Sequence, residues 1–128
     1  MKASFDATGD VIAITGGANG IGRALALACA KIGARVVVCD VNDEALASLQ
    51  TEAPSIAVRR LDVSDRAAVT ACFTELAQSI GPIDGLVCAA AIQPRTLIHE
   101  MDPAEWQRVI GINLNGVMWC YQAVIGSM

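Results

Sequence analysis

The stretch Val11-Ile-Ala-Ile-Thr-Gly-Gly-Ala-Asn-Gly-Ile-Gly22 decides how the rest of the chain folds. Its first four residues form an apolar run of the length expected for a buried strand. Four glycines then fall in residues 16–22, and apolar residues recur at helical spacing from Ile21 to Ile32. Glycines let a backbone turn tightly and approach a ligand, and the N–H groups of the following helix favour an anion. The stretch therefore predicts a pyrophosphate site; a tight turn without a ligand is the alternative.

Composition limits the class of protein and its partners. The 128 residues are 54% hydrophobic, which suits one domain over residues 1–128 with some surface buried against a partner. A net charge of −4 argues against nucleic acid or an anionic membrane surface. The longest uncharged runs contain Gly, Asn and Thr, and the N-terminus has no apolar stretch resembling a secretory signal. We therefore expect a cytoplasmic protein.

The cysteines do not suggest a metal site. The chain has five, an odd number, and they are scattered along the sequence without Cys-x-x-Cys or Cys/His ligand spacing. Most of them fall in apolar segments. We expect reduced, buried thiols and no bound metal.

Four apolar segments are predicted as strands, at residues 11–14, 35–39, 56–61 and 83–89. Helical patterns follow each one, after a polar lead-in with a turn at residues 8–10. The first helix is expected to end at Gly33. The expected N-caps of the later helices are Asn42 or Asp43, then Ser64, then Asp102 in a capping box with Pro103 and Glu105. The helical signal of the last segment continues to the end of the chain.

This alternation of strand and helix predicts the fold class. It implies a doubly wound α/β fold, with a parallel sheet and helices on both faces. With the ligand site at the first turn, the strand order is expected to be 3-2-1-4. The pair Arg59-Arg60 in the third strand agrees, because charged side chains in a strand favour a sheet edge.

The spacing of Thr15-Gly16, Gly20 and Gly22 differs from the common G-x-G-x-x-G fingerprint. It resembles the Thr-Gly-x-x-x-Gly-x-Gly turn of the short-chain dehydrogenase/reductase family. The resemblance implies a Rossmann-like fold that binds a nicotinamide dinucleotide, and oxidation of an alcohol or the reverse reduction. The cofactor contacts expected in this turn are Thr15, Gly16, Asn19, Gly20, Ile21 and Gly22.

Asp40 ends the second predicted strand, where an acidic residue hydrogen-bonds the ribose 2′-OH. A carboxylate there favours NAD(H) and repels the 2′-phosphate of NADP(H). Neither Gly17 nor Val41, which follows Asp40 in the expected site, supplies a cation for that phosphate. The alternative is that Asp40 only caps the next turn.

Two further segments match the cofactor site of the family. Asp62-Val63 ends the third strand, where the family binds adenine; alternatively, Asp62 caps the following helix in place of Ser64. Cys88-Ala89-Ala90-Ala91 falls where the family reads Asn-Asn-Ala-Gly. Ala89, Ala90 and Ala91 are small enough for close approach to the ribose, but alanine at position 91 carries a steric cost if its φ must be positive.

Asn113 matches the active-site asparagine of the family, which interrupts a helix and holds a water in the proton relay. The alternative is a mid-helix asparagine facing solvent. By analogy, His99 and residues 93–101 line the substrate side; a lone exposed histidine is the plainer interpretation of His99. The catalytic Ser and Tyr-x-x-x-Lys pair of the family lie beyond the asparagine, and Tyr121, the one tyrosine here, has Ile125 at the lysine position.

The resemblance therefore covers the dinucleotide-binding half of a family domain, and the chain is expected not to turn over alone. Three classes of function stay open: an oxidoreductase completed elsewhere, a non-catalytic NAD-binding module, and a structural or interaction protein. The apolar segment 113–128 and the outer edge of strand 83–89 predict a homodimer or larger assembly.

Overall fold

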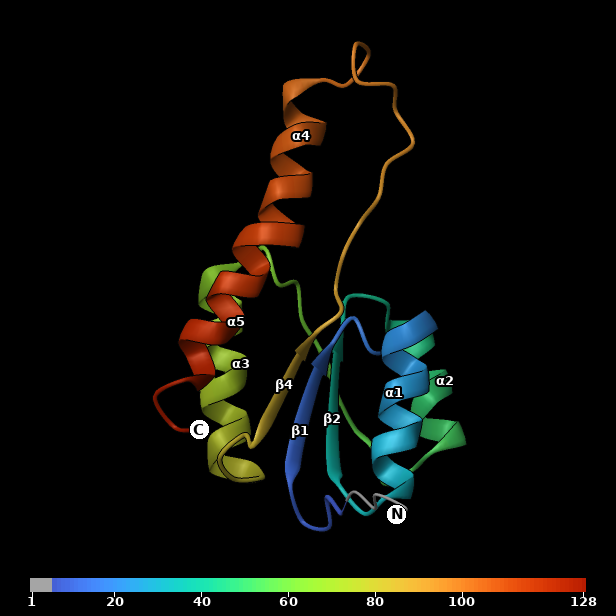
Figure 1. The fold of residues 1–128 in the computed structure, drawn as a ribbon, viewed down its shortest axis with the longest axis vertical. Helices are drawn as coiled ribbons and strands as arrows, with labels where there is room; N and C mark the ends of the chain where they lie inside the picture. The colour runs from blue at the N-terminus through green and yellow to red at the C-terminus, as the bar shows by residue number, and fades with distance from the viewer. Residues whose placement is uncertain (1–5) are drawn as a thin grey trace, which may run out of the picture.

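The computed structural model describes residues 6–128, and its centre is a four-stranded parallel sheet (Figure 1). The strands are β1 (Val11–Thr15), β2 (Arg35–Asp40), β3 (Ala57–Arg60) and β4 (Gly85–Cys88). Their order in the sheet is β3-β2-β1-β4, and all three pairings are parallel. The predicted order 3-2-1-4 is confirmed, and β3 with its two arginines lies on an edge.

Helices cover both faces of this sheet, which confirms the doubly wound α/β fold (Figure 1). The helical segments are α1 (Gly20–Lys31), α2 (Asp43–Glu52), α3 (Arg66–Ser79), α4 (Pro103–Ile110), the π-helical turn η1 (Gly111–Asn115) and α5 (Gly116–Val124). α1 and α2 lie on one face, whereas α3 and α5 lie on the other. α4 projects beyond the carboxyl end of the strands. None of the helices in residues 6–128 is long and apolar enough to cross a membrane.

Each face of the sheet has its own apolar layer. On β2, Val37 and Cys39 pack toward α3 and α5, while Val36 and Val38 pack toward α1 and α2. All four side chains are buried, as expected of a parallel strand covered on both faces. The layer beneath α3 and α5 also contains Val69, Phe73, Leu76, Cys120 and Val124. The other layer contains Ala26, Leu46 and Leu49.

The fourth strand is shorter than the predicted segment 83–89. The carboxylate of Asp84 accepts the N–H of Val11 at 2.8 Å and replaces a backbone partner there. Regular pairing with β1 begins only at Gly85, opposite Ile12. The turn expected before β1 is present, with Gly9 at φ +87°; the first five residues of the lead-in lie outside the described part of the chain.

The predicted cap of the third helix is wrong. Asp65, not Ser64, is the N-cap of α3, and its carboxylate accepts the N–H of Ala68 at 3.0 Å. Ser64 is occupied elsewhere, because its hydroxyl donates to the carboxylate of Asp62 at 2.7 Å. Asp62 itself does not cap α3 either. Competition between adjacent polar side chains thus moved the cap by one residue.

The other two caps are as expected. Of the two alternatives for α2, the structure selects Asn42, whose side chain accepts the N–H of Ala45 at 3.0 Å. Asp102 caps α4 by accepting the N–H of Glu105 at 2.8 Å. The carboxylate of Glu105 does not return the bond, because it accepts the hydroxyl of Thr96 at 2.7 Å.

We predict that Asp65→Ala lowers the free energy of unfolding by about 1 kcal/mol, the usual cost of losing a helix N-cap. Ser64→Ala should cost less, because it leaves the N-terminus of α3 capped. Denaturant unfolding of both variants measures the two costs. A larger loss for Ser64→Ala would contradict the role of Asp65 as the N-cap of α3.

Candidate functional site

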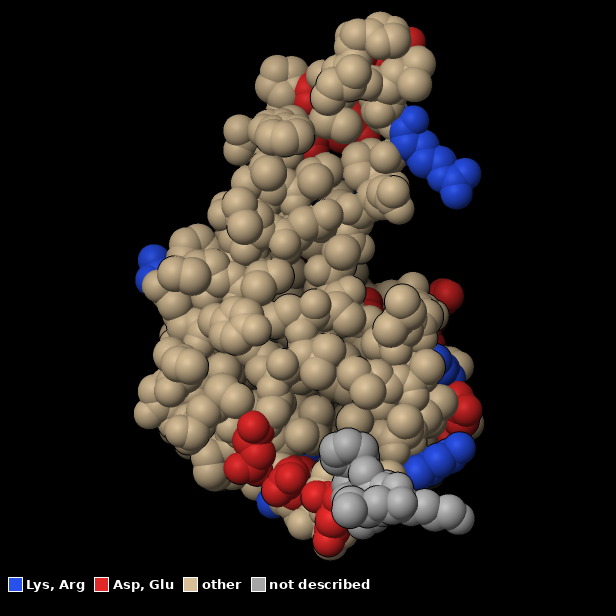
Figure 2. All heavy atoms as spheres, in the orientation of Figure 1, with Lys and Arg blue, Asp and Glu red and all other residues tan. Residues whose placement is uncertain are grey.

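A cavity of about 980 Å³ opens at the carboxyl end of the sheet. It is lined by the glycine turn, the ends of β2 and β3, the segment after β4, and the junction of α4 with η1. Figure 2 shows the molecule notched on this side, between the projecting α4 region and the body of the fold. Its volume suits a small-molecule or cofactor site. The structure thus forms one pocket where the sequence places a ligand.

Most of the residues expected to bind the cofactor line this pocket. They are Gly16, Asn19, Gly20, Ile21, Gly22, Asp40, Val41, Asp62, Val63, Ala89, Ala90 and Ala91. Thr15 and Asn113 do not line it. Six further residues line the pocket that no sequence motif predicted: Arg60, Leu61, Ser64, Ile92, Arg108 and Ile112.

The glycine turn lies so close to β4 that a side chain would not fit. Gly16 has φ +68°, and a Cβ built on it would collide with the backbone of Ala90. The N–H of Gly16 donates to the carbonyl of Cys39 at 2.7 Å, which joins the turn to β2 as well. A Cβ on Gly22 would likewise collide with the carbonyl oxygen of Gly16. Glycine is therefore required where the turn crosses the sheet.

The N-terminus of α1 lacks the side-chain cap that α2, α3 and α4 have. Asn19 occupies the N-cap position with an extended backbone, but its side chain accepts no cap hydrogen bond. The first turn of α1 also has no acidic residue. Its first N–H groups and the positive end of its dipole are thus available to an anion in the pocket.

Thr15 ends β1 and is buried. Its carbonyl accepts the N–H of Ala89 at 2.9 Å, which holds the segment after β4 against β1. Its hydroxyl and the thiol of Cys120 stabilise the thiolate of Cys88; Cys120 is the larger cause, and together they lower the pKa of Cys88 to about 7. Thr15 therefore holds in place the segment after β4, which lines the pocket.

Asp40 lines the pocket and also holds the turn that follows β2. Its carboxylate lines the pocket and accepts the N–H of Ala18 at 3.1 Å, within the glycine turn. The other oxygen accepts the N–H of Asn42 at 3.1 Å, which fixes the turn into α2. Val41 beside it is exposed. One carboxylate thus joins the ends of β1 and β2.

The hydroxyl of Ser64 and the backbone N–H of Ser64 hold the carboxylate of Asp62 at 2.7 and 2.9 Å. These bonds lower the pKa of Asp62, with the hydroxyl the largest cause, and the charges of Arg60 and Arg108 lower it further. Asp62 is therefore an ionised acceptor on the pocket wall. The adjacent Val63 is buried against Gly116.

The segment after β4 follows a relaxed path. No residue other than glycine has a positive φ in residues 6–128, so Ala91 does not bear the strain that its departure from the family pattern implied.

All five cysteines are free thiols; Cys39 and Cys120 are buried, whereas Cys29, Cys72 and Cys88 are partly exposed. Within the described residues, no group of three or more His, Cys, Asp or Glu side chains is arranged to hold a metal.

Asn113 lies in η1, where the helix is locally π-helical, as the resemblance implies. Its amide makes two hydrogen bonds to one residue: Oδ1 accepts the N–H of Ile92 at 2.9 Å, and Nδ2 donates to the carbonyl of Ile92 at 2.8 Å. The side chain is thus neither in the pocket nor merely solvated. It fixes the path of the pocket wall after β4.

A second cavity of about 290 Å³ adjoins the first. Its lining residues are Ile92, Gln93, Pro94, Glu105 and Arg108. Arg108 and Ile92 line both cavities. His99 lines neither; it is exposed and lies 3.8 Å from Glu100. Arg108 and Ile112 are four residues apart on one helical face, a signal that could have revealed them.

Comparison with known proteins places the chain in a family. A sequence model described as short chain dehydrogenase matches residues 10–128. The chain belongs to the short-chain dehydrogenase family. It is 40% identical over 116 residues to the 2-dehydro-3-deoxy-L-rhamnonate dehydrogenase (NAD(+)) of Sphingomonas sp. (strain SKA58), which covers 90% of this chain and 47% of that protein.

Other relatives show the same partial coverage. A sorbitol dehydrogenase of Cereibacter sphaeroides is 39% identical over 121 residues, covering 94% of this chain and 47% of that protein. The crystal structure of a short-chain dehydrogenase/reductase from Brucella melitensis superposes with a TM-score of 0.91 at 30% identity, over 98% of this chain and 55% of the other. The chain spans about half the length of the curated relatives named above.

We predict that Gly16→Ala lowers the free energy of unfolding by at least about 2 kcal/mol more than Gly9→Ala. Both glycines have positive φ, so both variants carry a left-handed strain of about 1 kcal/mol. Only at Gly16 does the added Cβ also meet backbone, since nothing lies within 4 Å of one at Gly9. Thermal and denaturant unfolding make the comparison; equal losses would contradict the close approach.

Proposed function

We propose that residues 1–128 form one domain, the NAD(H)-binding half of an oxidoreductase that interconverts an alcohol and a ketone. The observation that carries this is the uncapped N-terminus of α1 beside a glycine turn, facing a pocket of dinucleotide size. A pyrophosphate would supply the acceptors that α1 lacks. When bound, the nicotinamide supplies or accepts the hydride.

The same pocket supports a preference for NAD(H) over NADP(H). Asp40 would accept the hydrogen bonds of the adenosine ribose and repel a 2′-phosphate. Asp62 and Val63 would contact the adenine, and Ala89, Ala90 and Ala91 would pass close to the nicotinamide ribose. Arg60 also lines the pocket, but it is paired with Asp43 at 3.3 Å.

The chemistry of proton transfer would need groups beyond these residues. Asn113 is held by Ile92, and Tyr121 lies half-exposed on α5, with Ile125 one turn later. General acid–base groups are worth about 10²–10⁴ in rate. We therefore expect the 128 residues to bind the dinucleotide without turnover. The names of the relatives above support a polyol or sugar-acid substrate for the complete enzyme.

Two other functions stay as alternatives: a non-catalytic NAD-binding module, and a structural or interaction protein of the same fold. Thermal stabilisation by NAD separates the last from the others, because a ligand that binds the folded state raises its melting temperature. An assay of NADH production with a panel of alcohols, run on the whole protein, separates the proposed oxidoreductase from the non-catalytic NAD-binding module. The free thiols support a reducing compartment such as the cytoplasm.

The surface of η1 and α5 supports the expected self-association through residues 113–128. Leu114, Met118, Tyr121 and Ile125 are 61, 51, 49 and 66% exposed. Their spacing of four, three and four residues places them along one stripe, as in a helix–helix seam. Figure 2 shows few charged atoms over this flank. The open edge of β4, within residues 83–89, is the other candidate contact.

We predict that the chain binds NAD(H) more tightly than NADP(H), and that Asp40→Ser relaxes this preference by about 1–3 kcal/mol. Asp10→Ser is the matched control, since it removes the same charge from an exposed residue, before β1, that does not line the pocket. Titration calorimetry with both dinucleotides measures the preference. Equal affinities in the unmodified chain, or equal effects of the two substitutions, would contradict the role of Asp40.

We predict a dimer or larger assembly in light scattering at micromolar concentration. Met118→Glu and Tyr121→Glu should dissociate it if the stripe is the main contact, whereas Gln107→Glu, on the exposed surface of α4, should leave it intact. An assembly that survives both stripe variants would point to the β4 edge. A stable 13.3 kDa monomer would show that neither surface associates.

A further inference from the structure

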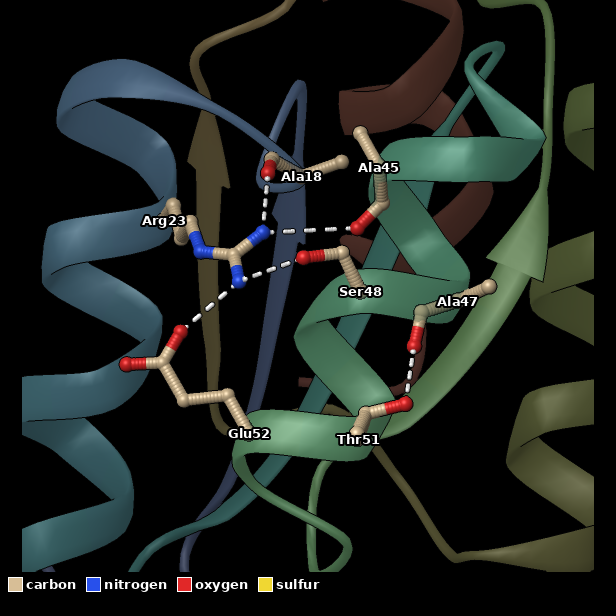
Figure 3. A network of polar contacts seen from close by, with 7 residues as sticks. All are labelled: Ala18, Arg23, Ala45, Ala47, Ser48, Thr51 and Glu52. Atoms are coloured by element: carbon tan, nitrogen blue, oxygen red, sulfur yellow. Dashed lines mark hydrogen bonds and ion pairs between the residues drawn. The ribbon is translucent and has the colours of Figure 1, made fainter.

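Arg23 lies outside the pocket, yet it is bonded to the turn that forms the pocket (Figure 3). It extends from α1 across to α2 and the glycine turn. Its Nη1 donates to the carbonyls of Ala18 and Ala45 at 3.0 and 3.4 Å. Its Nη2 donates to Ser48 Oγ at 3.2 Å and to Glu52 Oε2 at 2.7 Å. The two terminal nitrogens carry four N–H groups, and all four have acceptors.

These bonds are part of a closed ring that includes Asp40. The backbone of Ala18 is held on both sides of its Cα, because its N–H donates to Asp40 and its carbonyl accepts from Arg23. Asp40 also accepts the N–H of Asn42, and the Asn42 side chain accepts the N–H of Ala45. The carbonyl of Ala45 accepts from Arg23, which completes the ring. Ala18 itself is fully buried.

We propose that Arg23 is a positioning residue that sets the dinucleotide preference of the pocket by holding the backbone of Ala18 against Asp40. The proposal rests on the function proposed above. Asp40 discriminates between a ribose hydroxyl and a phosphate only while its carboxylate stays in place. Without Arg23, the carbonyl of Ala18 loses its bond, and the backbone on both sides of the Ala18 Cα becomes free to rotate, which moves the Ala18 N–H away from Asp40.

The charge of Arg23 is committed to this task. The carboxylate of Glu52 neutralises this charge at 2.7 Å, and the side chain of Arg23 is only 21% exposed. No terminal N–H group remains for a phosphate in the pocket. Arg23 is a cation next to the glycine turn, but in this role it disfavours NADP(H) and does not attract the 2′-phosphate. Ser48 and Glu52, both on α2, orient the guanidinium through direct hydrogen bonds.

Arg23→Met tests this role in the 128-residue chain, because it keeps an unbranched apolar stem and removes every donor. Arg59→Met is the matched control. Arg59 pairs with Glu75 through two 3.0 Å bonds on the other face of the sheet and does not line the pocket. This variant therefore removes the same charge at a site away from the pocket. Titration calorimetry gives the dissociation constants for NAD and NADP, and thermal unfolding gives the melting temperatures.

We expect Arg23→Met to weaken NAD binding by about tenfold and to reduce the ratio of NAD to NADP affinity by a similar factor. Arg59→Met should leave that ratio unchanged. A lower melting temperature with an unchanged ratio in Arg23→Met would overturn the proposal, because it would show a structural role only. If Arg23→Met does not fold, Glu52→Ala and Ser48→Ala each remove one acceptor of the Arg23 guanidinium, and the same ratio decides.

Failure of the proposed function gives a different result. If the unmodified chain binds neither dinucleotide, hydrogen exchange at the Ala18 amide tests the ring directly. At least about tenfold faster exchange in Arg23→Met than in Arg59→Met would support the ring. Equal exchange in the two variants would overturn it.

Discussion

The contact between the Gly16 backbone and the Ala89–Ala90 backbone is the constraint on which the rest of the structure depends. It brings the turn after β1 against the end of β4 and so fixes where α1 begins. The N–H groups of α1 then face the pocket, and Asp40 at the end of β2 lies within reach of Ala18. A larger residue at Gly16 would separate β4 from the turn, and the pocket floor would open.

The fold could be predicted from sequence because each local signal pointed to the same arrangement. The apolar runs, the glycine turn and the Arg59-Arg60 pair agree on a parallel sheet with β3 at its edge. The cap of α3 could not be predicted in the same way. Ser64 and Asp65 are both good cap residues, and the choice depends on Asp62, which takes the Ser64 hydroxyl.

The residues of the candidate site also fall into predictable and unpredictable groups. Residues that belong to the glycine turn or end a strand were predictable, because a motif places them. Arg60 and Arg108 were missed because the reach of a long side chain depends on packing between distant elements. Asn113 was found through its resemblance to the family residue, but its bonds to Ile92 depend on how α4 returns over the segment after β4.

The π-helical turn η1 makes the length of this helical region as constrained as its composition. Residues advance by about 100° each around an α-helix, and η1 already holds the extra residue of a π-helical turn, so inserting one more residue there would rotate α4 by about that angle relative to α5. α5 is anchored by Cys120 and Val124 in the core, so α4 would be the part that turns. Arg108 would then leave the pocket wall although no residue there had changed. Family members should therefore tolerate substitutions in this segment far better than insertions.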